Sequence, residues 1–175
     1  MLELEGKLTE VYLHPGELYL ARKPAIIRTI LGSCVGVTFW SEALGVGALC
    51  HSLLPRVPQD TYQDLSLAAR HRYVDFCIRD LARQFDELGA VRREMQVKLF
   101  GGADVLPVHS KPDAKPTVGK LNCEAAMEIV RSEGFVVAAS SLGGSEGLNI
   151  RFNTLTGKVL LRRLPKVLAD EVSEE

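Results

Sequence analysis

Cys34 and His51 are the two residues whose types and setting best suit chemistry in this sequence. Each lies in a short run rich in apolar and β-branched residues, and a turn-forming segment, residues 41–45, separates the two runs. A free thiol has a pKa of about 8.5, so a cysteine needs help to act as a nucleophile near neutral pH. A histidine within reach can stabilise the thiolate and later protonate a leaving group.

The two runs are predicted to form an antiparallel hairpin, whose register decides whether this pair can meet. With a four-residue turn, Trp40 pairs with Gly45, and Cys34 lies directly opposite His51 on the same face. A five-residue turn sends the two side chains to opposite faces, because a slip of one residue reverses the pattern. A β-bulge at a glycine would also change the count. The sequence leaves the register open.

Gly32 adds a second feature, because it permits a tight turn that could direct backbone N–H groups at a developing oxyanion. A cysteine in a β-rich run is nevertheless more often a small core residue. Cys50 is predicted to face the core because it neighbours His51 on one strand, and Cys77 falls in the apolar stripe of a helix. Cys123 is placed in the first turn of a later helix, whose dipole could lower its pKa.

Two helices are expected between β-rich ends. The first covers residues 64–88, where apolar side chains recur every three or four positions, and the second covers residues 122–133 with Asn122 as its N-cap. Between them, residues 103–120 form a long loop with three prolines, a type that is often functional. Strands are predicted at residues 17–21, 25–31, 34–40, 46–54, 95–100, 135–140, 148–152 and 158–164.

The composition narrows the class of protein. With 46% hydrophobic and 25% charged residues, the chain has an ordinary globular composition. No linker is evident, so one domain spanning residues 1–175 is expected, with a core at about 10–165 and an acidic tail at 166–175. A net charge of −1 without a basic stripe argues against nucleic-acid binding. An acidic start and the lack of a long apolar run predict a cytoplasmic protein that is not inserted in a membrane.

Two segments resemble the signature of the CheD family, the chemoreceptor glutamine deamidases. Residues 29–37 read Thr-Ile-Leu-Gly-Ser-Cys-Val-Gly-Val, and residues 45–55 end in His-Ser-Leu-Leu-Pro. Shorter agreements follow in order, so that the similarity spans about residues 10–165. These agreements lie at residues 73–75, 98–103, 118–124, 143–144 and 151–160.

The resemblance implies a catalytic site of three residues: Cys34 as the nucleophile, His51 as the base and Thr29 as the third member. It implies that glutamine side chains on methyl-accepting chemotaxis receptors are converted to glutamate through a thioester, which contributes to adaptation. Neither a metal nor another cofactor is required. The implied partners are the cytoplasmic helices of the receptors and a CheC-type phosphatase that acts on phosphorylated CheY.

The fold that the resemblance implies is α/β (α+β), a layered sandwich of mixed and antiparallel sheets packed against two helices. It is similar to the deamidase domain of cytotoxic necrotizing factor toxins. The sequence departs from the family pattern at Leu121, where an arginine is usual, and at Leu148 and Asn149, where a basic pair is common. These departures leave the three site residues untouched and bear on the docking of partners.

Two alternatives remain beside the deamidase. The chain could act chiefly as a non-catalytic regulator that binds a CheC-type phosphatase, or Cys34, His51 and His109 could form a metal site. The absence of a CxxC pair argues against a structural zinc site of the usual spacing, and the cysteines are expected as free thiols. Residues 103–120 are predicted to form one wall of the substrate groove.

Overall fold

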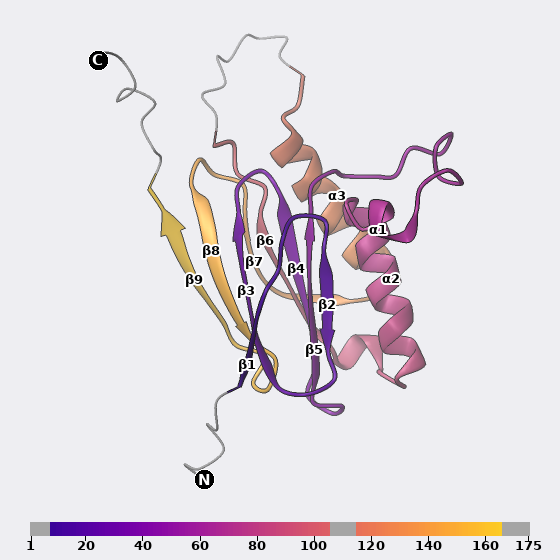
Figure 1. Cartoon of the computed structure of the whole chain (residues 1–175), viewed down its shortest axis with the longest axis vertical. Helices are drawn as coiled ribbons and strands as arrows, with labels where there is room; N and C mark the ends of the chain where they lie inside the picture. Colours follow the sequence, from indigo (N-terminus) through magenta and orange to yellow (C-terminus); the bar gives the residue numbers. More distant parts are fainter. Residues whose placement is uncertain (1–7, 106–114, 166–175) are drawn as a thin grey trace.

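A computed structural model describes residues 8–105 and 115–165 and shows three layers (Figure 1). A four-stranded sheet packs on one face of a five-stranded sheet, whose other face is covered by α2 (Val74–Glu87) and α3 (Val118–Ser132). The layered sandwich of mixed sheets and helices predicted from the sequence is confirmed. In the described part of the chain, no helix is long and apolar enough to span a bilayer.

The five-stranded sheet has the order β2-β5-β4-β6-β7, in which β6 and β7 run parallel and the other neighbours antiparallel. Its strands are β2 (Leu18–Ala21), β4 (Val35–Ser41), β5 (Val46–Ser52), β6 (Gln96–Gly101) and β7 (Val136–Leu142). The four-stranded sheet has the order β1-β3-β8-β9. Its strands are β1 (Thr9–Tyr12), β3 (Ala25–Leu31), β8 (Gly147–Asn153) and β9 (Val159–Leu164).

The predicted strands are confirmed to within two residues at their ends, and the sequence pattern does not predict β1. β1 is short and mostly exposed, and it pairs parallel with β3. Because it buries little, its sequence shows no clear alternation of apolar and polar residues.

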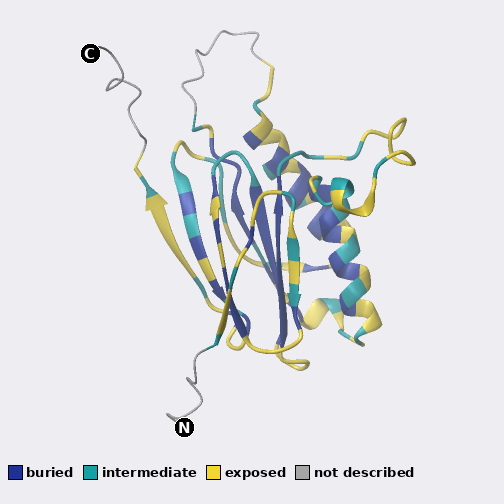
Figure 2. Cartoon of the chain, in the orientation of Figure 1, coloured by how far each residue is buried: buried dark blue, intermediate teal, exposed yellow. Residues whose placement is uncertain are grey.

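The core has two parts, one on each face of the five-stranded sheet. The part between the sheets contains Leu13, Ile27, Leu31, Trp40, Leu49, Phe100, Leu148, Ile150 and Phe152. The part beneath the helices includes Val37, Phe39, Cys50, Cys77, Leu81, Phe85, Ile129 and Val130. β4 and β5 contribute to both parts and are buried along their whole length (Figure 2). A strand covered on both faces reads as a continuous apolar run, as these two do.

The first predicted helix, residues 64–88, is interrupted. The structure has α1 (Leu67–Arg70) and α2, and Tyr73 between them is extended and pairs with Leu54. The N–H of Val74 donates to the Leu54 carbonyl at 2.8 Å. The prediction of one continuous helix is wrong because this pairing with the chain that follows β5 outweighs helix propensity.

The second helix, α3, starts earlier than residue 122. Thr117 is its N-cap, and its Oγ1 accepts a hydrogen bond from the N–H of Lys120 at 3.2 Å. The predicted N-cap, Asn122, is buried inside the helix, so that prediction is wrong. Threonine is also a favoured N-cap residue. Here it follows Pro116, which has no N–H to donate and so favours the start of a helix over its interior.

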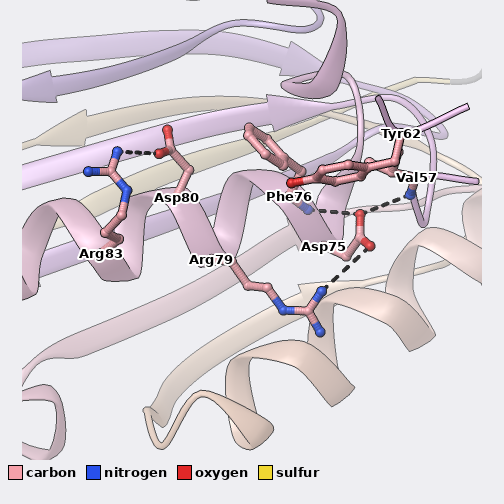
Figure 3. A pocket seen from close by; sticks show the side chains of 7 residues that line it. All are labelled: Val57, Tyr62, Asp75, Phe76, Arg79, Asp80 and Arg83. Carbon is pink, nitrogen blue, oxygen red and sulfur yellow. Dashed lines mark hydrogen bonds and ion pairs between the residues drawn. The ribbon is translucent and has the colours of Figure 1, made fainter. Parts of the chain in front are cut away.

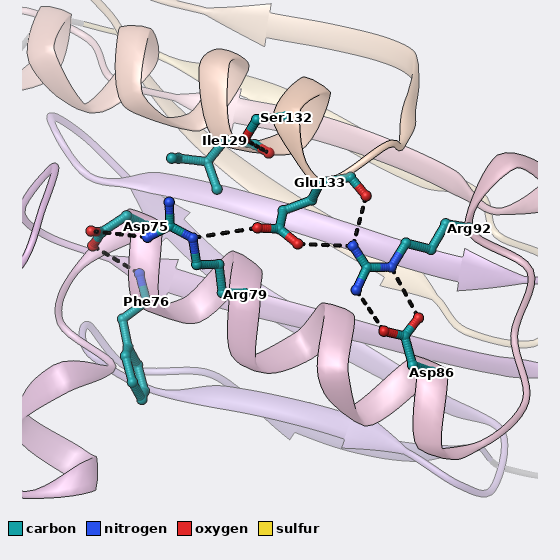
Figure 4. Close-up of polar contacts among 8 residues, drawn as sticks. All are labelled: Asp75, Phe76, Arg79, Asp86, Arg92, Ile129, Ser132 and Glu133. Carbon is teal, nitrogen blue, oxygen red and sulfur yellow. Dashed lines mark hydrogen bonds and ion pairs between the residues drawn. The ribbon is translucent and has the colours of Figure 1, made fainter.

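An ion-pair network joins the two long helices (Figure 4). Arg92, in the short 3-10 turn η1 (Arg92–Glu94), pairs with Asp86 of α2 at 2.5 Å and with Glu133, just beyond α3, at 2.8 Å. Arg79 of α2 also reaches Glu133, at 3.3 Å. A network of several charges stabilises more than an isolated surface pair does.

Candidate active site

The hairpin of β4 and β5 is confirmed, but its register differs from both predicted ones. Ser41 pairs with Val46, so the turn covers residues 42–45. Gly45 has a φ of +61° and its N–H donates to the Glu42 carbonyl at 3.1 Å, so it closes the turn instead of entering the ladder. The turn keeps the predicted length of four residues but lies one residue later in the chain, so the ladder starts at Ser41 and Val46 instead of at Trp40 and Gly45.

Gly36, and not Cys34, lies directly opposite His51 in this register. The prediction that Cys34 faces His51 directly is wrong. Cys34 lies two residues before Gly36, which by the two-residue period keeps it on the side of His51, diagonal to it. It is half-buried and packs against the cluster between the sheets. Among the described contacts, no hydrogen bond joins Cys34 to His51.

Thr29 and His51 do meet. Thr29 Oγ1 and His51 Nδ1 lie 2.7 Å apart, and both side chains are buried. Thr29 belongs to β3 and His51 to β5, so this hydrogen bond connects the two sheets. The Thr29 hydroxyl also lies 2.7 Å from the Leu13 carbonyl oxygen.

These two contacts determine the tautomer of the imidazole. A carbonyl oxygen only accepts and a hydroxyl has one proton, so Thr29 donates to Leu13 and accepts from Nδ1–H of His51. In the neutral imidazole Nε2 then holds the lone pair. Nε2 is buried and has no hydrogen-bond partner among the described residues. His51 therefore presents a basic nitrogen that the surrounding protein leaves free.

The environment keeps both candidate partners neutral. Burial lowers the pKa of His51 to about 4, against smaller opposing effects of the Leu13 carbonyl and the Glu17 charge. Burial also raises the pKa of the Cys34 thiol, against a smaller effect of a hydrogen bond from its own N–H. The thiolate–imidazolium pair expected from the sequence is therefore not the favoured state of the free protein. A proton would pass from sulfur to nitrogen during attack.

The segment before β4 is held by its carbonyl groups. The three carbonyls of residues 32–34 accept hydrogen bonds, in order, from the Ala103 N–H at 2.9 Å, the Asn122 side chain at 2.9 Å and the Gly102 N–H at 2.7 Å. In contrast, the N–H groups of Ser33 and Cys34 donate to no oxygen of another described residue.

Two glycines allow the end of β6 and the residue after it to lie close to the Cys34 segment. Gly101 and Gly102 have φ values of +95° and +68°, which side chains other than glycine rarely adopt. A Cβ on Gly101 would run into the Cys34 carbonyl oxygen, and one on Gly102 would run into the Cys123 sulfur. The segment that contains Cys34 therefore depends on glycine at both positions.

The other cysteines lack such a setting. Cys50 and Cys77 lie in the core beneath the helices, as the sequence predicts. Cys123 lies beyond the first turn of α3, because the helix starts at Val118, and the placement in the first turn is wrong. Burial raises the pKa of Cys123, whereas a lowering by the helix dipole was expected.

The remaining histidines do not join the site in the described residues. His14 is exposed, and His71 pairs with Asp80 at 3.1 Å. His109, the third ligand of the hypothetical metal site, lies outside the described residues, as does half of the predicted groove wall at 103–120. Within residues 8–105 and 115–165, no group of three or more His, Cys, Asp or Glu residues could hold a metal ion.

A hollow of about 260 Å³ beside α2 is a separate feature (Figure 3). Its lining residues are Val57, Tyr62, Asp75, Phe76, Arg79, Asp80 and Arg83. Arg79 pairs with Asp75 at 3.8 Å and Arg83 with Asp80 at 2.7 Å, so its charges are satisfied within the protein. None of the three predicted site residues lines it.

Sequence reasoning missed two groups at the site: the Leu13 carbonyl, which contacts Thr29, and the Asn122 side chain, which contacts the neighbouring residues Ser33 and Leu53. The Leu13 carbonyl has no sequence signal, because any residue supplies it. Asn122 has one: it is a polar residue at a position of the apolar stripe of α3, in step with Ala125, Ala126 and Ile129. A buried polar residue in such a stripe usually has a specific hydrogen-bond partner.

Comparison with known proteins gives consistent results. A family model described as CheD chemotactic sensory transduction matches residues 53–163. A probable chemoreceptor glutamine deamidase CheD 2 of Geobacter sulfurreducens is 42% identical over 164 residues, which cover 94% of this chain and 96% of that protein. A probable chemoreceptor glutamine deamidase CheD of Maridesulfovibrio salexigens is 33% identical over 95% of this chain and 98% of its own. One of Rhodospirillum rubrum is 36% identical over 93% and 87%.

Proposed function

Because the chain belongs to the CheD family of chemotaxis proteins, we propose that it hydrolyses glutamine side chains of chemoreceptors to glutamate, with Cys34 as nucleophile, His51 as base and Thr29 as the residue that orients His51. The relatives are named as chemoreceptor glutamine deamidases, which supports this substrate class. The three residues are those that the family resemblance of the sequence indicates.

One observation carries the assignment: the buried hydrogen bond from His51 Nδ1–H to Thr29 Oγ1. It leaves Nε2 as the basic nitrogen on the side of the sheet where Cys34 packs. In a hydrolase that uses cysteine, the base needs such an orienting partner. Catalytic hydrogen bonds are often long or misaligned before substrate binds, so a rotation of the Cys34 side chain towards Nε2 belongs to the proposal.

The reaction then proceeds in two halves. The Cys34 sulfur attacks the carbon of the glutamine carboxamide while its proton passes to Nε2 of His51, and a C–S bond forms. His51 returns this proton to the nitrogen as the C–N bond breaks, which releases ammonia and leaves a thioester. Water loses a proton to His51 and attacks the thioester; the C–S bond breaks, the thiol is restored and glutamate is the product.

The N–H of Cys34 is our candidate for the oxyanion donor. It lies beside its own sulfur, where it lowers the pKa of the thiol, and it has no acceptor on another described residue. The oxyanion of a tetrahedral intermediate develops on the oxygen of the attacked carbon, two bonds away from the sulfur, so this N–H is near the developing charge. Hydrogen bonds to the carbonyls of residues 32–34 hold the segment in this orientation.

Binding of a CheC-type phosphatase stays a prediction from the family resemblance, and no described surface is assigned to it. That one domain spans the chain also stays a prediction, as does the role of residues 103–120 as a groove wall. A groove wall would act on the approach of the receptor helix and not on the chemical steps.

The direct test uses the full chain and a receptor cytoplasmic fragment. Native protein should release ammonia and raise the mass of the fragment at specific glutamines, and Cys34→Ala should do neither while unfolding at an unchanged temperature. Cys123→Ala is the matched control, because Cys123 is also half-buried, and it should remain active. Deamidation by Cys34→Ala at the native rate would refute the assignment.

A further inference from the structure

Asn122 is a buried polar residue that forms a hydrogen bond to the residue directly before the proposed nucleophile, Cys34. Its side chain is fully buried within the first half of α3. Nδ2 donates to the Ser33 carbonyl at 2.9 Å and to the Leu53 carbonyl at 2.9 Å. Because both partners only accept, the orientation of the amide is determined, and both of its N–H groups are used.

These two carbonyls belong to the segments that carry the proposed catalytic residues. Ser33 immediately precedes Cys34, and Leu53 follows His51 by two residues. The ladder between β4 and β5 ends at the pair Val35 and Ser52, so the next residues on each side have no ladder partner. Asn122 bridges the two chains where their own pairing stops.

Helix α3 can reach this point because its first turn approaches the neighbouring loop closely. A Cβ on Gly119 would lie 2.6 Å from the Gly102 carbonyl oxygen and 2.9 Å from that of Ala103. Gly102 and Ala103 themselves donate to two carbonyls of residues 32–34. The start of α3 thus braces the Cys34 segment through Asn122 and stands directly against the loop that holds its other carbonyls.

We propose that Asn122 is a positioning residue that fixes the separation between the Cys34 segment and the chain after His51, so that the sulfur can reach Nε2. The inference rests on the proposed function, since it acts through Cys34 and His51. It assigns Asn122 no contact with the substrate.

A purely space-filling role does not account for this residue. Oδ1 of Asn122 is buried and has no hydrogen-bond partner among the described residues, which is unfavourable. Leucine has a similar size, a higher helix propensity and no such atom. What leucine lacks is the pair of donors, and these go to the two segments whose spacing matters.

The test compares Asn122→Leu and Asn122→Asp with native protein on a receptor fragment. Asn122→Leu should lower kcat about 10- to 100-fold, as loss of a residue that orients a reacting group does, with KM unchanged. Asn122→Asp should lose more, because its carboxylate would face two carbonyl oxygens. Lys120→Ala, an exposed neighbour on α3, and Ala126→Gly, which weakens the same helix, are the matched controls.

A second readout is the alkylation rate of Cys34 with iodoacetamide, located by peptide mapping. If Asn122 couples Cys34 to His51, His51→Gln alone should slow alkylation relative to native protein. Added to Asn122→Leu, the same change should slow alkylation no further. An equal slowing in both backgrounds, a native kcat in folded Asn122→Leu, or a kcat loss matched by Ala126→Gly at equal loss of stability would each overturn the inference. If native protein converts no glutamine, the proposed function fails, and the alkylation cycle alone decides on Asn122.

Discussion

Replacement of Thr29 by valine removes one hydroxyl and keeps the volume of a fully buried side chain. The hydroxyl makes two contacts of 2.7 Å, to Leu13 and to His51. Without it, the Leu13 carbonyl and the Nδ1–H of His51 both lose a partner in a buried setting. An unsatisfied buried group costs about 1–3 kcal/mol, and the imidazole also loses its preference for the tautomer with a free Nε2.

The same energy translates into a rate. If the orientation of His51 is worth about 1–3 kcal/mol in the transition state, Thr29→Val should lower kcat roughly 5- to 150-fold, since about 1.36 kcal/mol corresponds to a factor of ten. KM should change little, because Thr29 is fully buried and does not reach the substrate. The assay is ammonia release from a receptor fragment at saturating substrate.

Thr38→Val is the matched control. Thr38 is also buried, on β4, but its hydroxyl makes only a long contact of 3.5 Å, to the Lys98 carbonyl. It should keep a native kcat. Equal kcat values for Thr29→Val and native protein, with both folded, would refute the reasoning that Thr29 orients the base.

Three further outcomes follow from the structure. Gly101→Ala should lower activity at least tenfold and destabilise the protein by about 2–4 kcal/mol, because its Cβ overlaps the Cys34 carbonyl and its φ is +95°. Gly45→Ala is the control: it has a positive φ but lies in open space, so it should cost about 1 kcal/mol and leave activity intact. Chemical denaturation and ammonia release measure the two effects. Burial lowers the pKa of His51 from 6.5 to about 4, so the unfolded chain takes up a proton first; the free energy of unfolding should fall by about 3 kcal/mol as the pH drops from 6.5 to 4, and His51→Gln should lack this component in urea titrations. Arg92→Ala should cost about 1 kcal/mol of stability through its ion pairs and leave kcat unchanged.

The sequence could predict the pairing of β4 with β5, and it placed Cys34 and His51 on a shared side of the sheet in only one of the two registers considered. The pairing follows from the two apolar runs on either side of a turn-forming segment, whereas the side depends on the register. The sequence could not predict the register, because Gly45 could either pair or close the turn. Only its left-handed conformation in the folded chain decides between these options.

Contacts between distant segments were the least predictable part. Thr29 and His51 lie on different sheets, and only the family resemblance suggested that they belong together. Tyr73 breaks a convincing helical pattern because Leu54 offers it a strand-like partner. Asn122 reads as a cap by its residue type, and becomes an interior bridge once Thr117 caps the helix.

The most direct test of the central claim, that Nε2 of His51 serves the Cys34 thiol as a base, is the pH dependence of Cys34 alkylation in native protein and in His51→Gln. Native protein should react at pH values well below the raised pKa of its thiol, down to a limit near the pKa of His51 at about 4. In His51→Gln this reactivity at low pH should disappear, leaving only the rise that accompanies ionisation of the thiol. Superimposable profiles for the two proteins would contradict the claim.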